Sequence, residues 1–162
     1  LEIVTLLAAH ATADDLTCTN TDGCTVLHCA AVRGDARALD AVVQLYGQLG
    51  VSLEAKTAEG HTALFLACHH GHAGCVLALL AAGASLLEDC GEGSTPLEAA
   101  MGACSPHLLE VLGEAIGECI ARAESLKLAD LTHYLFLAAL RGCPSLGHTM
   151  YCAAWRRHAG SC

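Results

Sequence analysis

Three stretches decide the fold: residues 22–35 read DGCTVLHCAAVRGD, residues 59–72 read EGHTALFLACHHGH, and residues 92–105 read EGSTPLEAAMGACS. Each opens with an acidic residue, a glycine, a variable residue and a threonine, and each continues into a pattern rich in alanine or cysteine. Thr62 and Thr95 are 33 residues apart, and Thr25 and Thr62 are 37 apart. A period of about 20–50 residues indicates a protein built by stacking one repeated unit on the next.

Each stretch carries the local signals of a turn followed by helices. An acidic residue before glycine favours a tight turn, and the threonine hydroxyl can cap a helix that starts directly after it. Gly34 and Gly71 interrupt the helical pattern, so each is predicted to end the first helix of its repeat. In the middle copy a second, apolar helix follows over residues 75–80 and ends at Gly83. One repeat is therefore predicted to be a turn and a pair of helices.

The repeated pattern resembles the ankyrin repeat, whose signature is T-P-L-H-x-A. The closest local copies are TVLH at residues 25–28 and TPL at residues 95–97. The resemblance implies an all-α solenoid of stacked helix-turn-helix pairs, joined by short β-turn fingers. Small residues in the first helices, such as Ala30, Ala31 and Ala67, would let neighbouring repeats approach closely.

We expect a single ankyrin-repeat domain over residues 1–162. Its predicted parts are a partial repeat at 1–19, repeats at 20–56 and 57–89, a repeat with a long second helix at 90–127, and a degenerate capping repeat at 128–162. Gly34 and Gly50 are 16 residues apart, whereas Gly71 and Gly83 are 12 apart. The four extra residues therefore lie in the second helix of the first full repeat, where they add about one turn.

Composition excludes some classes of partner. The formal net charge is −9 and the longest basic block is the pair Arg156-Arg157, so nucleic acid is not expected, because phosphate binding depends on lysine and arginine. No apolar run reaches the roughly 20 residues of a membrane span. The eleven cysteines form no CxxC motif and mostly lie in apolar helical patterns. We expect reduced and mostly buried thiols, and a cytoplasmic or nuclear localisation.

The stretch CHHGHAGC at residues 68–75 suggests a metal site or a catalytic cluster. The repeat accounts for most of it, because Cys68 and Cys75 fall at packing positions and His72 follows the turn glycine of the ankyrin pattern. His69 and His70 remain, at the end of a first helix. Another metal alternative is the group Cys18, Cys24, His28 and Cys29, but its spacings are loose for zinc, and the resemblance gives His28 a structural role near the threonine. Motifs such as H-E-x-x-H and the P-loop are absent, so we predict no metal, no cofactor and no enzymatic activity.

The resemblance implies a protein-binding module or scaffold that binds a partner polypeptide on its concave face, formed by the turn tips and the ends of the first helices. The predicted partner-binding residues on that face are Asp22, Arg33, Glu59, His61, His69, His70 and Glu92. Two alternatives stay open from the sequence. One is a metal- or redox-responsive domain that uses the cysteines and histidines, and the other is a regulatory segment of a larger enzyme.

Overall fold

A computed structural model describes residues 12–91, 93–103 and 108. The chain divides into two compact units, 1–103 and 104–162. Leu108, the described residue of the second unit, is buried. The first unit contains the elements described below. The predicted repeats at 1–19 and 90–127 are described only in part, and the predicted capping repeat at 128–162 lies outside the described residues.

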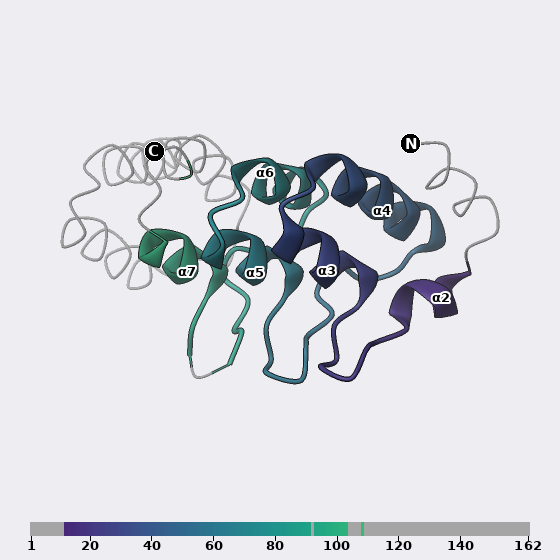
Figure 1. The fold of residues 1–162 in the computed structure, drawn as a ribbon, viewed down its shortest axis with the longest axis horizontal. Coiled ribbons are helices and arrows are strands. Elements are labelled where there is room, and N and C mark those ends of the chain that lie inside the picture. Colours follow the sequence, from purple (N-terminus) through teal and green to yellow (C-terminus); the bar gives the residue numbers. More distant parts are fainter. Residues whose placement is uncertain (1–11, 92, 104–107, 109–162) are drawn as a thin grey trace, which may run out of the picture. The chain divides into compact units, whose positions relative to one another are not determined.

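The described part is helical, as the sequence predicts. Its helices are α2 (Ala13–Thr17), α3 (Val26–Arg33), α4 (Ala36–Leu49), α5 (Ala63–His69), α6 (Ala73–Ala81) and α7 (Pro96–Gly102). The first helices of successive repeats, α3, α5 and α7, lie side by side in one layer, and the second helices α4 and α6 form another (Figure 1). Looped fingers extend from the layer of first helices (Figure 1). We call the surface formed by these fingers and by α3, α5 and α7 the first-helix face. No described helix is long and apolar enough to cross a membrane.

The repeated threonines start the first helices as predicted. The hydroxyl of Thr62 accepts a hydrogen bond from the backbone N–H of Phe65 at 3.2 Å. Thr95 accepts from the N–H of Glu98 at 3.3 Å, and the Glu98 carboxylate accepts from the N–H of Thr95 at 3.1 Å. These bonds satisfy donors that the first turn of a helix leaves without a partner. The invariant threonine therefore fixes where each first helix begins.

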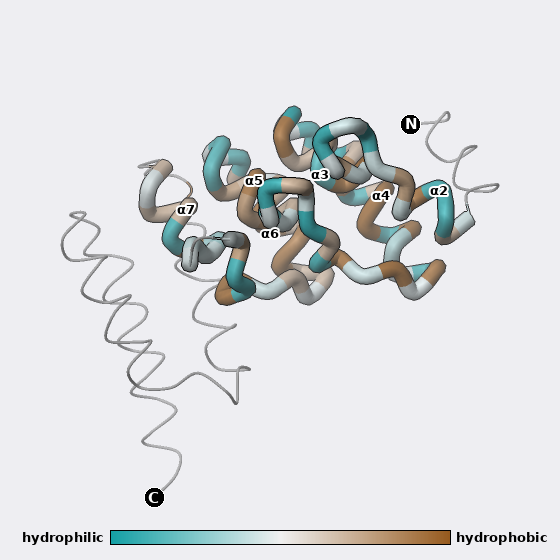
Figure 2. Tube along the Cα trace, turned by 90° about the horizontal axis from the view of Figure 1, so that it is seen from below, coloured by the Kyte–Doolittle hydropathy of each residue, from teal (hydrophilic) through white to brown (hydrophobic). Residues whose placement is uncertain are grey.

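Small side chains fill the space between neighbouring first helices. Ala31, Ala67 and Ala100 are fully buried, and so is Cys68. Hydrophobic and hydrophilic residues alternate along these helices (Figure 2). First helices with small buried side chains can approach their neighbours closely, so part of the core forms between repeats.

The second helices confirm the predicted extra turn. Helix α4 has 14 residues and α6 has nine, so the insertion inferred from the glycine spacing lies in α4. The longer helix also has a tertiary role, because the buried hydroxyl of Tyr46 donates to the carbonyl oxygen of Leu16 at 2.8 Å. Leu16 belongs to α2, a short helix that the repeat pattern did not predict. Its start is a capping box between Thr12 and Asp15.

A histidine of one repeat packs under the turn glycine of the preceding repeat. Gly34 ends α3 in the left-handed conformation, with a φ of 72°. A Cβ atom added at Gly34 would lie 2.6 Å from the His72 ring, and Nε2 of that ring donates to the Val32 carbonyl oxygen at 3.0 Å. The turn therefore requires glycine both for its backbone and for the closeness of the next repeat.

We expect Gly34→Ala to destabilise the protein more than Gly50→Ala. Gly50 has a similar φ of 66° but open space around it, so its change should cost only the left-handed strain of roughly 1–2 kcal/mol. At Gly34 the overlap with the His72 ring should lower the free energy of unfolding by about 1–3 kcal/mol more. Urea unfolding of both variants measures the difference. Equal losses, or a Gly34→Ala loss that His72→Ala does not reduce, would contradict this contact.

Candidate functional site

Five aromatic rings follow one another along the surface of the middle repeat, and we call them the ring row. The rings of His61 and Phe65 are stacked, with centroids 4.4 Å apart and planes 10° apart. Phe65 meets His69 edge to face at 6.2 Å, and His69 stacks on His70 at 5.3 Å. His70 and His72 are 6.0 Å apart. The predicted cluster of His61, His69 and His70 is therefore one continuous feature.

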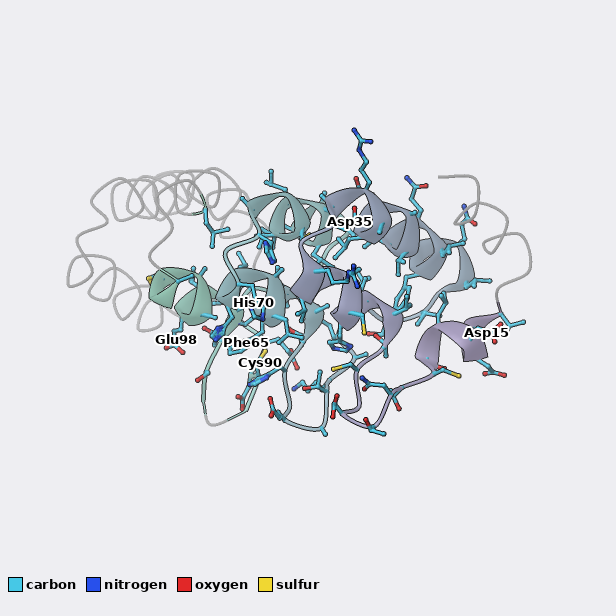
Figure 3. All side chains as sticks on the ribbon, viewed as in Figure 1. Asp15, Asp35, Phe65, His70, Cys90 and Glu98 are labelled. Atoms are coloured by element: carbon cyan, nitrogen blue, oxygen red, sulfur yellow. The ribbon has the colours of Figure 1, made fainter. Side chains whose placement is uncertain are left out.

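The repeat itself places these rings together. His61 is the last residue before the capping threonine, and Phe65 and His69 follow at intervals of four residues, which brings them to one side of α5. His70 and His72 lie on either side of Gly71, where the chain turns into α6. The side chains of Phe65 and His70 and their position on the middle repeat are labelled in Figure 3. All five rings therefore come from the finger, the first helix and the turn of a single repeat.

A shallow pocket of about 320 Å³ opens beside the ring row. Its lining is formed by Phe65 and His69 from one repeat and by Ala99, Gly102 and Ala103 at the end of α7 and just after it. The α7 residues have small side chains or none, so they leave space over the aromatic side of α5. The pocket therefore lies at the boundary between two first helices, on the first-helix face.

The charges near the ring row are unevenly distributed. The Glu59 carboxylate lies 3.3 Å from Nδ1 of His61, and its side chain is 80% exposed at the tip of the finger. Partial burial lowers the pKa of His70 below the ordinary value of 6.5, and repulsion by the neighbouring His69 and His72 imidazoles lowers it further. Its ring is therefore neutral at pH 7. At that pH the finger end of the row is acidic, and the His70 end carries no charge from that residue.

The other predicted partner-binding residues lie apart from the ring row. Asp22 is exposed on the finger of the preceding repeat, and Arg33 is exposed at the end of α3. Both lie on the first-helix face, but no contact joins them to the five rings among the described interactions. Glu92 lies outside the described residues. The structure thus brings together four of the seven predicted residues, Glu59, His61, His69 and His70.

His28 has a structural role, as the resemblance implied. Its ring is fully buried, and Nε2 lies 3.0 Å from the carbonyl oxygen of Ala55, in the segment that leads to the next finger. Because a carbonyl oxygen only accepts, Nε2 carries the hydrogen, and Nδ1 accepts from the backbone N–H of Thr25 at 3.1 Å. Both ring nitrogens are therefore occupied by hydrogen bonds. Burial is also the main reason that the pKa of His28 is lowered.

Because of these hydrogen bonds, His28 is not free to bind a metal ion together with Cys18, Cys24 and Cys29. Within residues 12–91, 93–103 and 108, no group of three or more histidine, cysteine, aspartate or glutamate side chains could hold a metal ion.

The expectation of mostly buried thiols holds for Cys68, Cys75 and Cys90 and is wrong for Cys18 and Cys29, which are exposed.

Sequence reasoning missed Phe65 and the small residue Ala99 of α7, which line the pocket together. Phe65 occupies the fourth position of the threonine motif, where the first repeat has His28 and the third has Glu98. Two features of the sequence could have revealed Phe65: the aromatic residue at this position of the repeat, and the four-residue spacing of His61, Phe65 and His69. The pocket also depends on Ala99, which aligns with Leu66 in the preceding repeat, so only a comparison of repeats side by side could have found it.

Comparisons with known proteins agree with this geometry. The family described as ankyrin repeats (3 copies) matches residues 35–121. The fold is similar to the crystal structure of an ankyrin repeat domain from Acinetobacter baumannii, with 20% identity and a TM-score of 0.68 over 93% of this chain and 74% of that one. It is also similar to the ankyrin repeat domain of Bcl-3, a member of the IkappaB protein family, with 25% identity and a TM-score of 0.66. That match covers 94% of this chain and 64% of the Bcl-3 domain. No curated protein matches the sequence.

We expect the stabilising effect of His28 to depend on pH. Because its pKa is lower in the folded than in the unfolded chain, its contribution is fully present above the unfolded pKa near 6.5 and is lost as pH falls through the folded pKa. His28→Gln should therefore cost about 1–3 kcal/mol of unfolding free energy at about pH 7.5 and distinctly less at about pH 5.

Urea unfolding at the two pH values measures this change. His69→Gln is the matched control, since His69 is exposed and its loss should cost within about 0.5 kcal/mol at both pH values. A His28→Gln cost that stays the same, or that grows on acidification, would contradict a buried neutral imidazole.

Proposed function

Because the chain belongs to the ankyrin-repeat family, whose members are generally protein–protein interaction modules, we propose that it binds a partner polypeptide on its first-helix face. Domains of this family are typically non-catalytic, and we propose the same for this chain. The proposed contact residues are the seven that the sequence predicts on this face: Asp22, Arg33, Glu59, His61, His69, His70 and Glu92.

One observation carries this proposal: the ring row and the apolar pocket beside it lie together on the first-helix face. Aromatic side chains supply large contact area with few rotatable bonds, and they are enriched where proteins bind one another. The pocket lies near the lower limit of the volumes that hold small-molecule ligands, and among its lining residues only His69 has a polar side chain. A site of this kind suits the side chain of a polypeptide better than a free cofactor.

The charge of the chain favours one class of partner. With a net charge of −9 and exposed acids at Asp22 and Glu59, the fingers attract basic peptides and repel nucleic acid. The buried thiols of Cys68, Cys75 and Cys90 serve as small apolar groups in the core. Since unpaired thiols of this kind persist in reducing compartments, we propose that the protein acts in the cytoplasm or the nucleus.

Selection of binding peptides from a displayed random library tests the proposed function. We expect the selected peptides to bind the double variant His69→Ala/His70→Ala at least about tenfold more weakly than the wild type, a loss of about 1.4 kcal/mol. Fluorescence anisotropy with the purified proteins measures the dissociation constants.

The matched control is Gln44→Ala/Gln48→Ala, which removes two exposed polar side chains from α4 in the other layer. It should leave the affinity unchanged within about twofold. Peptides whose binding depends on α4 and is indifferent to His69 and His70 would show that the first-helix face is not the binding surface.

A further inference from the structure

We propose that the pocket beside Phe65 and His69 receives one large apolar side chain from a basic peptide segment, whose lysine or arginine pairs with Glu59. This inference rests on the proposed function and specifies the partner's chemistry at the same face.

The pocket selects for an apolar group of limited size. Its 320 Å³ are bounded by the Phe65 ring, the His69 ring and the small residues Ala99, Gly102 and Ala103. A polar group placed there would exchange its water for a lining that offers few hydrogen-bonding partners, which costs free energy. A leucine, methionine or phenylalanine side chain would instead remove apolar surface from water on both sides, which favours binding.

The aromatic wall of the pocket is held in place before any partner binds. Phe65 is packed face to face against His61 and edge to face against His69, and it projects from the regular backbone of α5. Aromatic pairs in these arrangements stabilise one another beyond the area that they bury. The wall therefore requires little ordering when a ligand arrives, and a preorganised site loses less of its binding free energy to that cost.

Acidic groups lie at the finger end of the ring row. Glu59 contacts His61, which in turn stacks on Phe65, so the carboxylate is one ring away from the pocket wall. The neighbouring finger carries the exposed Asp89. Lys56 does not offset these acids, because its ammonium group is paired with the Glu88 carboxylate at 3.0 Å and donates to the Asp89 carbonyl oxygen at 2.7 Å. A cationic group on the partner would therefore complement the acidic charge at this finger end.

These positions set the order of groups in the peptide. The His61 and Phe65 ring centroids are 4.4 Å apart, and an extended peptide advances about 3.3 Å per residue. An apolar residue in the pocket and a lysine or arginine a few positions away can therefore occupy the pocket and reach Glu59 together. A peptide with an acidic residue at that place would meet the Glu59 carboxylate instead and would be repelled.

Ala99→Leu tests the pocket by filling it from within the protein. The position tolerates larger residues, because the corresponding residues of the other repeats are Cys29 and Leu66, on the same helical register. The matched control is Ala81→Leu, which adds the same atoms at an exposed position of α6. The probes are the peptides selected on the wild-type protein, together with synthetic copies in which the apolar anchor becomes alanine or the basic residues become glutamate.

We expect Ala99→Leu to weaken the selected peptides at least about tenfold, while Ala81→Leu changes their affinity less than about twofold. The anchor-to-alanine peptides should bind the wild type weakly and should be insensitive to Ala99→Leu. Glu59→Gln should weaken the basic peptides severalfold and reduce the salt dependence of their binding. Unchanged unfolding midpoints of all three variants show that the fold is intact.

The proposal is overturned if peptides that require His69 and His70 bind Ala99→Leu as tightly as the wild type, or if the glutamate copies bind as well as the basic ones. In either case a polypeptide still binds the first-helix face, and the proposed function stands. If instead the selected peptides are indifferent to His69 and His70 as well, the proposed function itself fails.

Discussion

The close packing of neighbouring first helices is the constraint on which the rest of the structure depends. Ala31, Ala67 and Ala100 are fully buried in first helices that contact one another, and close-packed interiors leave no room for larger side chains without a shift of the backbone. The same approach brings the His72 ring under Gly34 and within hydrogen-bonding distance of the Val32 carbonyl oxygen in the preceding repeat. Because these contacts join one repeat to the next, a single repeat has no complete core of its own.

The candidate site follows from the same register. The repeats align so that His28, Phe65 and Glu98 hold equivalent positions, as do Val32, His69 and Gly102. His28 is buried and Glu98 joins the helix cap, whereas a phenylalanine ring can make neither set of hydrogen bonds. Phe65 instead stacks on His61. With only small residues opposite it on α7, that ring becomes the wall of a pocket.

The fold was predictable because every repeat carries the same threonine and glycine signals, and these act locally. The grouping of Glu59, His61, His69 and His70 was predictable for the same reason, since all four come from one repeat. Phe65 was missed because its apolar character fits an ordinary helix, and its role depends on Ala99 in another repeat. The exposure of Cys29 was missed because the alternation of apolar residues in α3 does not fix which of its sides faces solvent. Local patterns thus predict elements, and contacts between repeats decide which side chains remain accessible.

The most direct test of this account is a crystal structure of the protein with one of the selected peptides bound. The account predicts a peptide that lies on the first-helix face, with one apolar side chain against the Phe65 and His69 rings and a basic side chain near the Glu59 carboxylate. A peptide bound across α4 and α6, or one that crosses the first-helix face and leaves the pocket beside Phe65 empty, would contradict it.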